Sequence, residues 1–410
     1  MAVKSKVVTG NMLIAQSGGP TMVINQSLIG AVVEAKKHKA AIKKIYGSLH
    51  GIAGILGENF IDLGKENAST LEAIANTPSS ALGSVRKKPT KDDCVAIFKV
   101  LQKYNIRFFF YIGGNDSAET THIINEEAKS YGYDMQCYHI CKTIDNDLLE
   151  NDHTPGFGSG ARFVAQAFMG DNLDNRALPG VKINIIMGRH AGFLTAAAAL
   201  ARVYPDDGPH LIYLPERPFS VDKFVKDVKA VYKKYGRCMI AVSEGIADKD
   251  GTAIAAKFIK EVDSHGNVQL SGSGALGDLL AKEIKDKAKI SRVRADTFGY
   301  LQRSFAGLVS EVDAKEARGV GQKAVIEAVK GKFANGSIAI KRKPGKKYTV
   351  YFERVPLKNV AKETRHMPDK FINKAANDVT QAFIDYAKPI IGKLPPIGRF
   401  KGVAVKKIAG

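Results

Sequence analysis

Residues 106–130, IRFFFYIGGNDSAETTHIINEEAKS, contain the two patterns that decide the fold. Residues 108–112 form a continuous apolar run, which is typical of a strand buried on both faces of a parallel sheet. A polar, helix-forming stretch follows at 117–130, directly after Gly113 and Gly114. A buried strand that turns at once into a helix predicts a βα unit.

The same order recurs along the chain: NMLIAQ precedes a predicted helix at 21–38, VKINIIMG one at 191–203, HLIYLP one at 221–235, and RCMIAVSEG a further helical stretch. Buried strands that alternate with helices form parallel sheets covered by helices on both faces. We therefore predict an α/β fold. The glycine-rich run TPGFGSG interrupts the alternation, and we expect a domain boundary near residue 157.

Two further elements are predicted near the C-terminus. The segment 336–357, GSIAIKRKPGKKYTVYFERVPL, has the pattern of a β-hairpin that turns at Pro344-Gly345. Its lysines are typical of a solvated edge strand. A final helix is expected at 369–387.

The composition is that of a globular protein long enough for two ordinary domains, with 410 residues, 45% hydrophobic and 25% charged. The net charge of +20 gives a surface that favours anionic partners. Nucleic acid and phosphorylated metabolites both qualify. The basic residues are spread through helical stretches without an arginine-rich arm, which favours a solvated lysine face over a nucleic-acid interface.

The cellular location is predicted from the cysteines and the N-terminus. Cys94, Cys137, Cys141 and Cys238 show neither CxxC pairing nor the density of a disulfide framework, so we expect reduced thiols. The N-terminus has no apolar signal segment, and no apolar run approaches the roughly 18 residues of a membrane span. We expect a cytoplasmic protein without a membrane partner.

Two Gly-Gly turns follow predicted strands. Gly18-Gly19 comes after the first strand, and Gly113-Gly114 leads into Asn115, Asp116 and Ser117. Backbone N–H groups at such turns and at helix N-termini attract phosphate. A single Gly-Gly pair is also an ordinary tight turn, and Asp116 or Ser117 is a good helix N-cap. Two such turns favour phosphate binding, although Asp116 puts a carboxylate where a phosphate would sit.

The segment KTIDND, residues 142–147, carries the strongest chemical pattern. Asp145 and Asp147 follow an apolar strand end, and Lys142 lies three residues before the first of them. A calcium loop would need a glycine and a glutamate that are missing here. Phosphoryl transfer fits better, because it uses one carboxylate as a base, one toward Mg²⁺ and a cation for phosphate oxygens.

Further candidates end later strands. Arg189 follows Met187 and Gly188 at a strand end, where a guanidinium can bind phosphate through two hydrogen bonds. Glu244 follows another buried strand, whereas His190 is more simply a packed or solvated histidine. Arg292, Arg294 and Arg303 surround an aromatic residue and a glycine, which fits either a basic surface strand or a sugar-phosphate pocket.

Together, GGPTMVIN, GGNDS, KTIDND, MGRHAG, PERPF, SEG and the R-x5-Y-x-x-R of Arg294 to Arg303 resemble the phosphofructokinase family, in this order and along almost the whole chain. The segment VPLKNVAKETRHMP is similar to the tail of the longer, pyrophosphate-dependent members. The resemblance implies two Rossmann-like domains with the active site in the cleft between them. The donor domain would comprise 1–157 plus about 302–365, and the fructose 6-phosphate domain 158–301 plus about 366–410.

The resemblance also implies the reaction, a reversible transfer of a phosphoryl group to the 1-hydroxyl of fructose 6-phosphate with Mg²⁺ as cofactor. Asp145 would act as the base. The implied catalytic residues are Asp145, Lys142, Arg189, Asp147 and Thr143. The implied donor-binding residues are Gly18, Gly19, Arg86, Gly114, Asn115, Asp116, Ser117 and Lys142. The implied substrate-binding residues are Thr143, Asp145, Met187, Gly188, Arg189, Glu244, Arg294, Tyr300 and Arg303. The implied metal ligands are Asn115, Asp145 and Asp147.

Two positions imply the donor. ATP-dependent members usually have glycine at the positions of Asp116 and Lys142, whereas pyrophosphate-dependent members have an aspartate and a lysine. A carboxylate at Asp116 would repel and obstruct an α-phosphate, and Lys142 could pair with it and also bind pyrophosphate. Asn115 departs from the aspartate common in the family, and its amide oxygen would ligate Mg²⁺ without charge.

Other readings stay open. These are an ATP-dependent phosphofructokinase that accommodates the two residues, a catalytically silent regulatory subunit, and a nucleic-acid-binding protein suggested by charge alone. The resemblance implies a homodimer or homotetramer in which arginines are contributed across the interface. The strand before MGR often holds one such arginine in the family, and Lys182 lies nearby in this chain.

Overall fold

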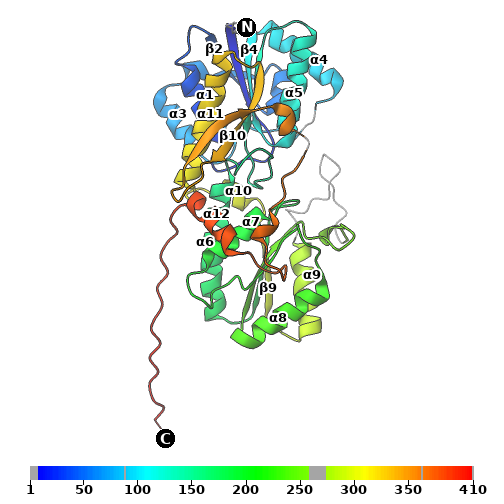
Figure 1. Ribbon diagram of the computed structural model, residues 1–410, viewed down its shortest axis with the longest axis vertical. Helices are drawn as coiled ribbons and strands as arrows, with labels where there is room; N and C mark the ends of the chain where they lie inside the picture. Colours follow the sequence, from blue (N-terminus) through cyan, green and yellow to red (C-terminus); the bar gives the residue numbers. More distant parts are fainter. Residues whose placement is uncertain (1–7, 87–88, 258–273, 362, 409–410) are drawn as a thin grey trace.

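The computed structural model describes residues 8–86, 89–257, 274–361 and 363–408. Two α/β halves, each with its own sheet, lie one above the other along the long axis of the molecule (Figure 1). The predicted fold class, α/β with mainly parallel sheets, is confirmed.

The larger sheet has the strand order β11-β10-β5-β4-β1-β2-β3. Its inner strands run parallel, while β3 and β11 pair antiparallel at the two edges. The bounds are β1 Gly10–Gln16, β2 Ile42–Ser48, β3 Phe60–Asp62, β4 Ile106–Gly113, β5 Gln136–Cys141, β10 Asn335–Arg342 and β11 Val350–Val355.

Helices cover both faces of this sheet, as the continuous apolar strands predicted. In β4, Phe108 and Phe110 face the core formed with α1, α3 and α11, whereas Phe109 and Tyr111 face the core formed with α2, α4 and α5. The helix bounds are α1 Ile24–Ala35, α2 Gly51–Leu56, α3 Ala68–Ala75, α4 Lys91–Lys103, α5 Asn115–Ser130 and α11 Glu311–Lys330.

The smaller sheet has the order β7-β8-β6-β9, and its strands are all parallel. One face packs against α6, α7 and α12, and the other against α8 and α9. The bounds are β6 Val181–Ile186, β7 Leu211–Tyr213, β8 Cys238–Ser243, β9 Val293–Thr297, α6 Phe157–Ala177, α7 Phe193–Ala196, α8 Val221–Tyr235, α9 Ala275–Glu283, α10 Leu301–Ser304 and α12 Gln381–Ile391.

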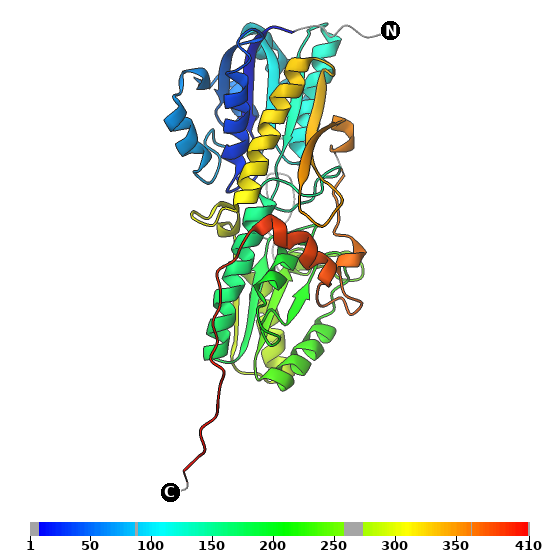
Figure 2. The ribbon, with the colours of Figure 1, turned by 60° about the vertical axis from the view of Figure 1, so that its left-hand side comes forward.

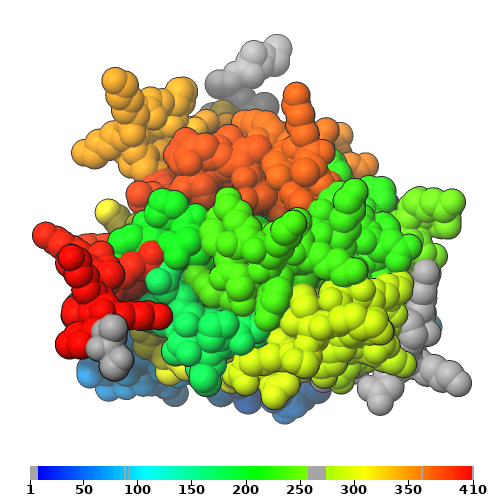
Figure 3. All heavy atoms as spheres, turned by 90° about the horizontal axis from the view of Figure 1, so that it is seen from below, coloured from blue at the N-terminus to red at the C-terminus, as the bar shows by residue number. Residues whose placement is uncertain are grey.

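The chain passes between the halves more than once. After β5 it enters the smaller half through α6, which begins at Phe157, and after β9 it returns through α11 to add β10 and β11 to the larger sheet. It then crosses again to α12 and ends in an extended segment that leads away from the body (Figure 2). Seen from the end of the smaller half, that segment lies at one margin of the face (Figure 3).

Several predicted elements match closely, and two differ. The helix expected at 191–203 is the four-residue α7 followed by a 3-10 helix at Ala197–Ala201. The helix at 221–235 and the hairpin around Pro344-Gly345 are confirmed by α8 and by the antiparallel pair β10 and β11. The final helix expected at 369–387 is present, but its predicted bounds are wrong. A short 3-10 turn at Asp369–Phe371 is followed by a loop, and α12 begins only at Gln381.

Candidate active site

A cavity of about 750 Å³ lies between the two halves, at the carboxyl ends of β1, β4, β5, β6 and β8. Loops at these ends are where α/β sheets bind ligands. Most of the sequence-predicted site residues line it: Gly18, Gly19, Arg86, Gly114, Asn115, Asp116, Ser117, Lys142, Thr143, Asp145, Asp147, Met187, Arg189, Glu244 and Arg303. Gly188, Arg294 and Tyr300 are not among the lining residues.

Three cations surround the first glycine turn. The Lys142 ammonium donates to the Gly19 carbonyl oxygen at 2.7 Å. A Cβ placed on Gly19 would lie 3.0 Å from a guanidinium nitrogen of Arg303 and 3.7 Å from one of Arg86. Gly18 has φ +73°, a conformation that favours glycine. The backbone of the Gly18-Gly19 turn, which carries no side chains, therefore lies close to three positively charged groups.

Two of these cations, Lys142 and Arg303, have lowered pKa values. Burial, together with the charges of Arg303 and Arg86, lowers the pKa of Lys142 to about 8, although the neighbouring carboxylates oppose this. Burial and the charge of Arg86 lower the pKa of Arg303 as well. A bound polyanion would compensate this cluster, so the arrangement favours a phosphate compound.

The second glycine turn differs in detail from the prediction. The N-cap of α5 is Gly114, so neither Asp116 nor Ser117 has that role, and both lie in the first turn of the helix. The Asp116 side chain is exposed, while Lys142 is buried against Gly19. Within the described residues no ion pair joins Lys142 to Asp116, so the expected pairing is not formed. Asp116 and Lys142 thus line the same cavity from separate loops without contacting each other.

The carboxylate pair lies on a tight turn between β5 and α6. Asn146, between the two aspartates, has φ +60°, a left-handed conformation that Asn tolerates better than most residues. Its side-chain oxygen accepts from the Thr154 amide at 3.1 Å, and its Nδ2 donates to the Tyr386 hydroxyl at 2.8 Å. The buried Asn146 thus anchors the turn, and Asp145 and Asp147 both line the cavity.

The electrostatics suit a base that operates near neutral pH. Burial, Asp147 and Glu244 raise the pKa of Asp145 to about 7, against the opposing effect of Lys142 and Arg189. Burial also raises the pKa of Asp147, against a hydrogen bond from Thr143. Two close carboxylates cannot both ionise easily, so the pair loses its last proton only near pH 7.

The oxygen groups fit Mg²⁺. The Asn115 Oδ1 atom is buried without a hydrogen-bond partner, and Asn115 lines the same cavity as Asp145 and Asp147. No cluster of three or more His, Cys, Asp or Glu side chains suited to a metal occurs in the part of the chain that the structure describes. Two carboxylates and an amide oxygen suit Mg²⁺, which keeps several waters and takes phosphate oxygens as further ligands.

The predicted sugar-phosphate residues divide into two groups. Met187, Arg189 and Glu244 line the cavity from the smaller half. Gly188 lies beneath it, where its carbonyl accepts from the Ser243 hydroxyl at 2.7 Å. Arg294 is exposed on β9, and Tyr300 is 43% exposed beside the Arg303 guanidinium.

Lys182 forms ion pairs on the same strand edge. Its ammonium lies 3.6 Å from the Asp171 carboxylate and also contacts Asp296 on β9. Arg294, which pairs in register with Lys182, therefore lies on an outer surface of the smaller half, away from the cavity of its own chain.

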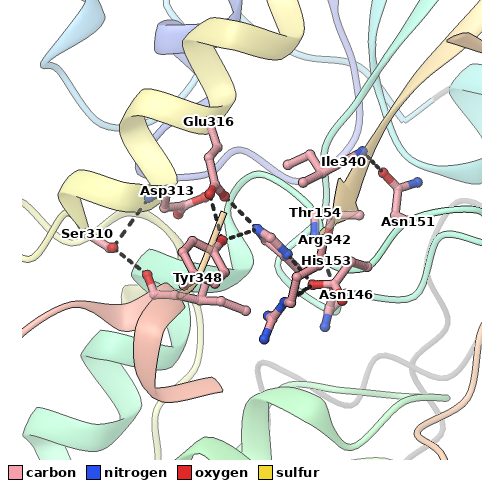
Figure 4. Close-up of polar contacts among 12 residues, drawn as sticks. Asn146, Asn151, His153, Thr154, Ser310, Asp313, Glu316, Ile340, Arg342 and Tyr348 are labelled. Atoms are coloured by element: carbon pink, nitrogen blue, oxygen red, sulfur yellow. Dashed lines mark hydrogen bonds and ion pairs between the residues drawn. The ribbon is translucent and has the colours of Figure 1, made fainter. Parts of the chain in front are cut away.

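Sequence reasoning missed a polar network behind the carboxylate turn. His153 bonds Asp152 at 2.7 Å and Glu316 at 2.5 Å, and Figure 4 shows its ring beside Glu316, Tyr348 and Arg342. Burial lowers the pKa of His153, but its hydrogen bonds with the two carboxylates outweigh this and raise it. Because these residues come from distant segments, no local motif could indicate the network.

Sequence reasoning also missed two cavity residues and a supporting histidine. Thr364 and His190 line the cavity, and His190 is exposed there, which agrees with the solvated alternative considered for it rather than with a packed one. Burial and Arg189 lower the pKa of His190. His139 is buried under the second glycine turn and bonds the Gly113 carbonyl and the Ser337 hydroxyl, each at 2.8 Å. His139 supports the second glycine turn because it lies next to that turn in the folded protein, although the two are far apart in the sequence.

Glycine turns, a cluster of cations and a pair of neighbouring aspartates at the ends of parallel strands define an α/β protein that binds phosphate compounds. No helix within the described ranges is long and apolar enough to cross a membrane.

The chain belongs to the phosphofructokinase family, whose model matches residues 11–327. The pyrophosphate–fructose 6-phosphate 1-phosphotransferase of Rhodospirillum rubrum is 56% identical over 402 residues, which cover 97% of this chain and 98% of the relative. The sulfofructose kinase of Alkalicoccus urumqiensis is 30% identical and covers 94% and 96%. The crystal structure of a pyrophosphate-dependent phosphofructokinase from Marinobacter aquaeolei has a TM-score of 0.84 at 32% identity, covering 98% of each chain.

Proposed function

We propose that this protein catalyses the reversible transfer of a phosphoryl group from pyrophosphate to the 1-hydroxyl of fructose 6-phosphate, with Mg²⁺. The larger half would bind pyrophosphate, and the smaller half fructose 6-phosphate. The observation that carries the proposal is the group of three cations at Gly19, with Lys142 buried among them, next to a carboxylate pair in which Asp145 loses its proton only near pH 7. The identity to relatives with this activity supports it.

The chemistry follows from these residues. Asp145 takes the proton of the 1-hydroxyl as the sugar oxygen forms its bond to phosphorus, and the bond from phosphorus to the bridging oxygen of pyrophosphate breaks. Inorganic phosphate leaves. Lys142, Arg86 and Arg303 stabilise the charge that develops on the phosphate oxygens, and Arg189 orients the acceptor. Bound Mg²⁺, held by Asn115, Asp145 and Asp147, would neutralise phosphate oxygens.

Pyrophosphate rather than ATP is the proposed donor because Asp116 faces the cavity. A carboxylate in the first turn of α5 is compatible with a helix N-terminus, but it would repel an α-phosphate. Purified protein with fructose 6-phosphate and Mg²⁺ should form fructose 1,6-bisphosphate with pyrophosphate. Turnover with ATP and none with pyrophosphate would overturn the donor assignment. Inactivity with every donor would favour the silent regulatory subunit.

The donor assignment has a sharper test in the double variant Asp116→Gly with Lys142→Gly. Removal of both side chains should allow ATP to bind and, at reduced rate, to react. The matched control is Asp92→Gly, which removes an exposed carboxylate from the first turn of α4 and should leave donor preference unchanged. If ATP gains neither binding nor turnover, obstruction by Asp116 is not what excludes it.

We also propose a homo-oligomer, on the evidence of two predicted substrate-binding residues. Arg294 and Tyr300 lie outside the cavity of their own chain, so we propose that they complete the site of a partner subunit. Mixing inactive Asp145→Asn with inactive Arg294→Ala should then restore about a quarter of wild-type activity, because hybrid dimers contain one intact site. If activity does not recover after the subunits exchange, the two subunits do not share their active sites.

We also propose a cytoplasmic location, which the four free, buried cysteines support.

A further inference from the structure

Residues 363–367, here called the strap, run between the two halves of the molecule. Thr364 forms an antiparallel bridge with Leu148, and the Arg365 amide donates to the Asp147 carbonyl at 2.7 Å. The strap therefore lies directly alongside the turn that carries the two site aspartates. In the sequence, this segment is notable only for its similarity to the tail of longer family members.

The guanidinium of Arg365 gathers the carbonyl groups of the carboxylate turn. It donates to the Asn146 carbonyl through Nε at 3.1 Å and through Nη2 at 2.6 Å. Its Nη1 donates to the Asp152 carbonyl at 2.8 Å and also to that of Asn151. A planar guanidinium with five donors can make these four hydrogen bonds together, whereas a lysine ammonium has only three donors, all on one atom.

The neighbours of Arg365 in the strap contact the other loops of the cavity. The Asn115 amide nitrogen lies 3.3 Å from the Glu363 carbonyl, which orients the partnerless Asn115 Oδ1 away from it. His366 bonds the His190 carbonyl at 2.8 Å.

The strap is tied to the smaller half in two further ways. The Met367 amide donates to Glu216 at 3.0 Å, and the same Glu216 oxygen accepts from the Gly192 amide at 2.8 Å. The Arg365 guanidinium also lies 4.8 Å from the centre of the Phe193 ring. One short segment thus contacts the donor turn, the carboxylate turn and the loop after β6.

We propose that the strap, through Arg365, fixes the position of Asp145 and Asp147 relative to the donor and sugar loops, so that Arg365 is a positioning residue for phosphoryl transfer. This proposal rests on the function proposed above. Arg365 holds backbone carbonyls rather than substrate, so its loss should lower the rate of the chemical step more than substrate binding. A misplacement of about 1 Å can cost about 10²-fold in rate.

The test compares Arg365→Met, Arg365→Lys and the control Arg202→Met. Arg202 is a half-buried arginine that holds Asp378 and the Pro209 carbonyl away from the cavity. We expect Arg365→Met to lower kcat by about 10²-fold, with the KM for fructose 6-phosphate and for pyrophosphate within threefold of wild type. Arg365→Lys should recover part of kcat, and Arg202→Met should leave it within twofold.

Hydrogen–deuterium exchange gives a second measurement that needs no turnover. Peptides from 143–154 should exchange faster in Arg365→Met than in wild type, while strand β6 should not change. If wild type itself fails to use pyrophosphate, the proposed function is wrong, and the exchange data still decide the role of the strap. An unchanged exchange rate in 143–154, a kcat within threefold of wild type, or a loss confined to KM would each overturn the proposal.

Discussion

Replacing Lys142 with methionine should raise the free energy of unfolding of the protein when no donor is bound. The same substitution should abolish the use of pyrophosphate as donor. The Lys142 side chain is buried, and its pKa falls from 10.5 to about 8. Each pKa unit corresponds to about 1.4 kcal/mol, so the protonated lysine destabilises the donor-free protein by about 3 kcal/mol at pH 7. Loss of the hydrogen bond to Gly19 costs about 1 kcal/mol, which leaves a net gain of about 2 kcal/mol.

The pH dependence identifies the cause. Because the folded pKa of Lys142 lies below 10.5, the unfolded chain binds more protons between about pH 8 and pH 10.5. The free energy of unfolding of wild type should therefore rise with pH across that window, while that of Lys142→Met lacks this contribution. The difference in stability between the two proteins should shrink as the pH rises.

Urea unfolding of both proteins from pH 7 to pH 10.5, with and without pyrophosphate, measures these effects. Pyrophosphate at about 100 times its Kd should stabilise wild type by about 2.7 kcal/mol and the variant far less. Lys129→Met on the surface of α5 is the control and should change stability by no more than about 0.5 kcal/mol. A donor-free variant that is less stable than wild type, or a difference independent of pH, would refute the reasoning.

Three further predictions concern the site. Asp145→Asn should lower kcat for the formation of fructose 1,6-bisphosphate from pyrophosphate by about 10³-fold, because the base is lost while the shape of the site is kept. Wild-type kcat/KM should fall as the pH drops through about 7, where Asp145 becomes protonated, and a profile flat from pH 6 to 8 would contradict this. Asn115→Ala should raise the Mg²⁺ concentration needed for half-maximal turnover by about tenfold, whereas EDTA should abolish turnover; an unchanged Mg²⁺ requirement would exclude Asn115 as a ligand.

The strands and the loop ends of the cavity could be predicted from sequence because their signals are local. A buried parallel strand such as β4 has no polar alternation, and the residues that follow it must lie at the carboxyl edge of the sheet. For that reason the loops that carry Asp116 and Asp145, each of which follows a predicted strand, could be assigned to one site although they are far apart in the chain.

The errors come from tertiary contacts and from side chains that compete with the helix. Asn373 accepts the amides of Asn377 and Asp378 through its side chain, which forms a turn where a helix to residue 387 was expected. The expected pair of Lys142 with Asp116 failed because the Gly19 carbonyl takes the ammonium. Arg365 could not be recognised, since its partners are backbone carbonyls, which carry no sequence signal.

The strand order of the larger sheet has a consequence for synthesis of the chain. β10 lies next to β5, and His139 meets Ser337 across 198 residues of sequence. The strands of the smaller sheet, β6 to β9, come from one continuous stretch of chain that is synthesised before β10. This sheet can therefore form on the ribosome while the edge of β5 in the larger sheet is still unpaired. A nascent chain at that stage offers a strand edge to other chains, which makes it the point at which chaperones would be needed most.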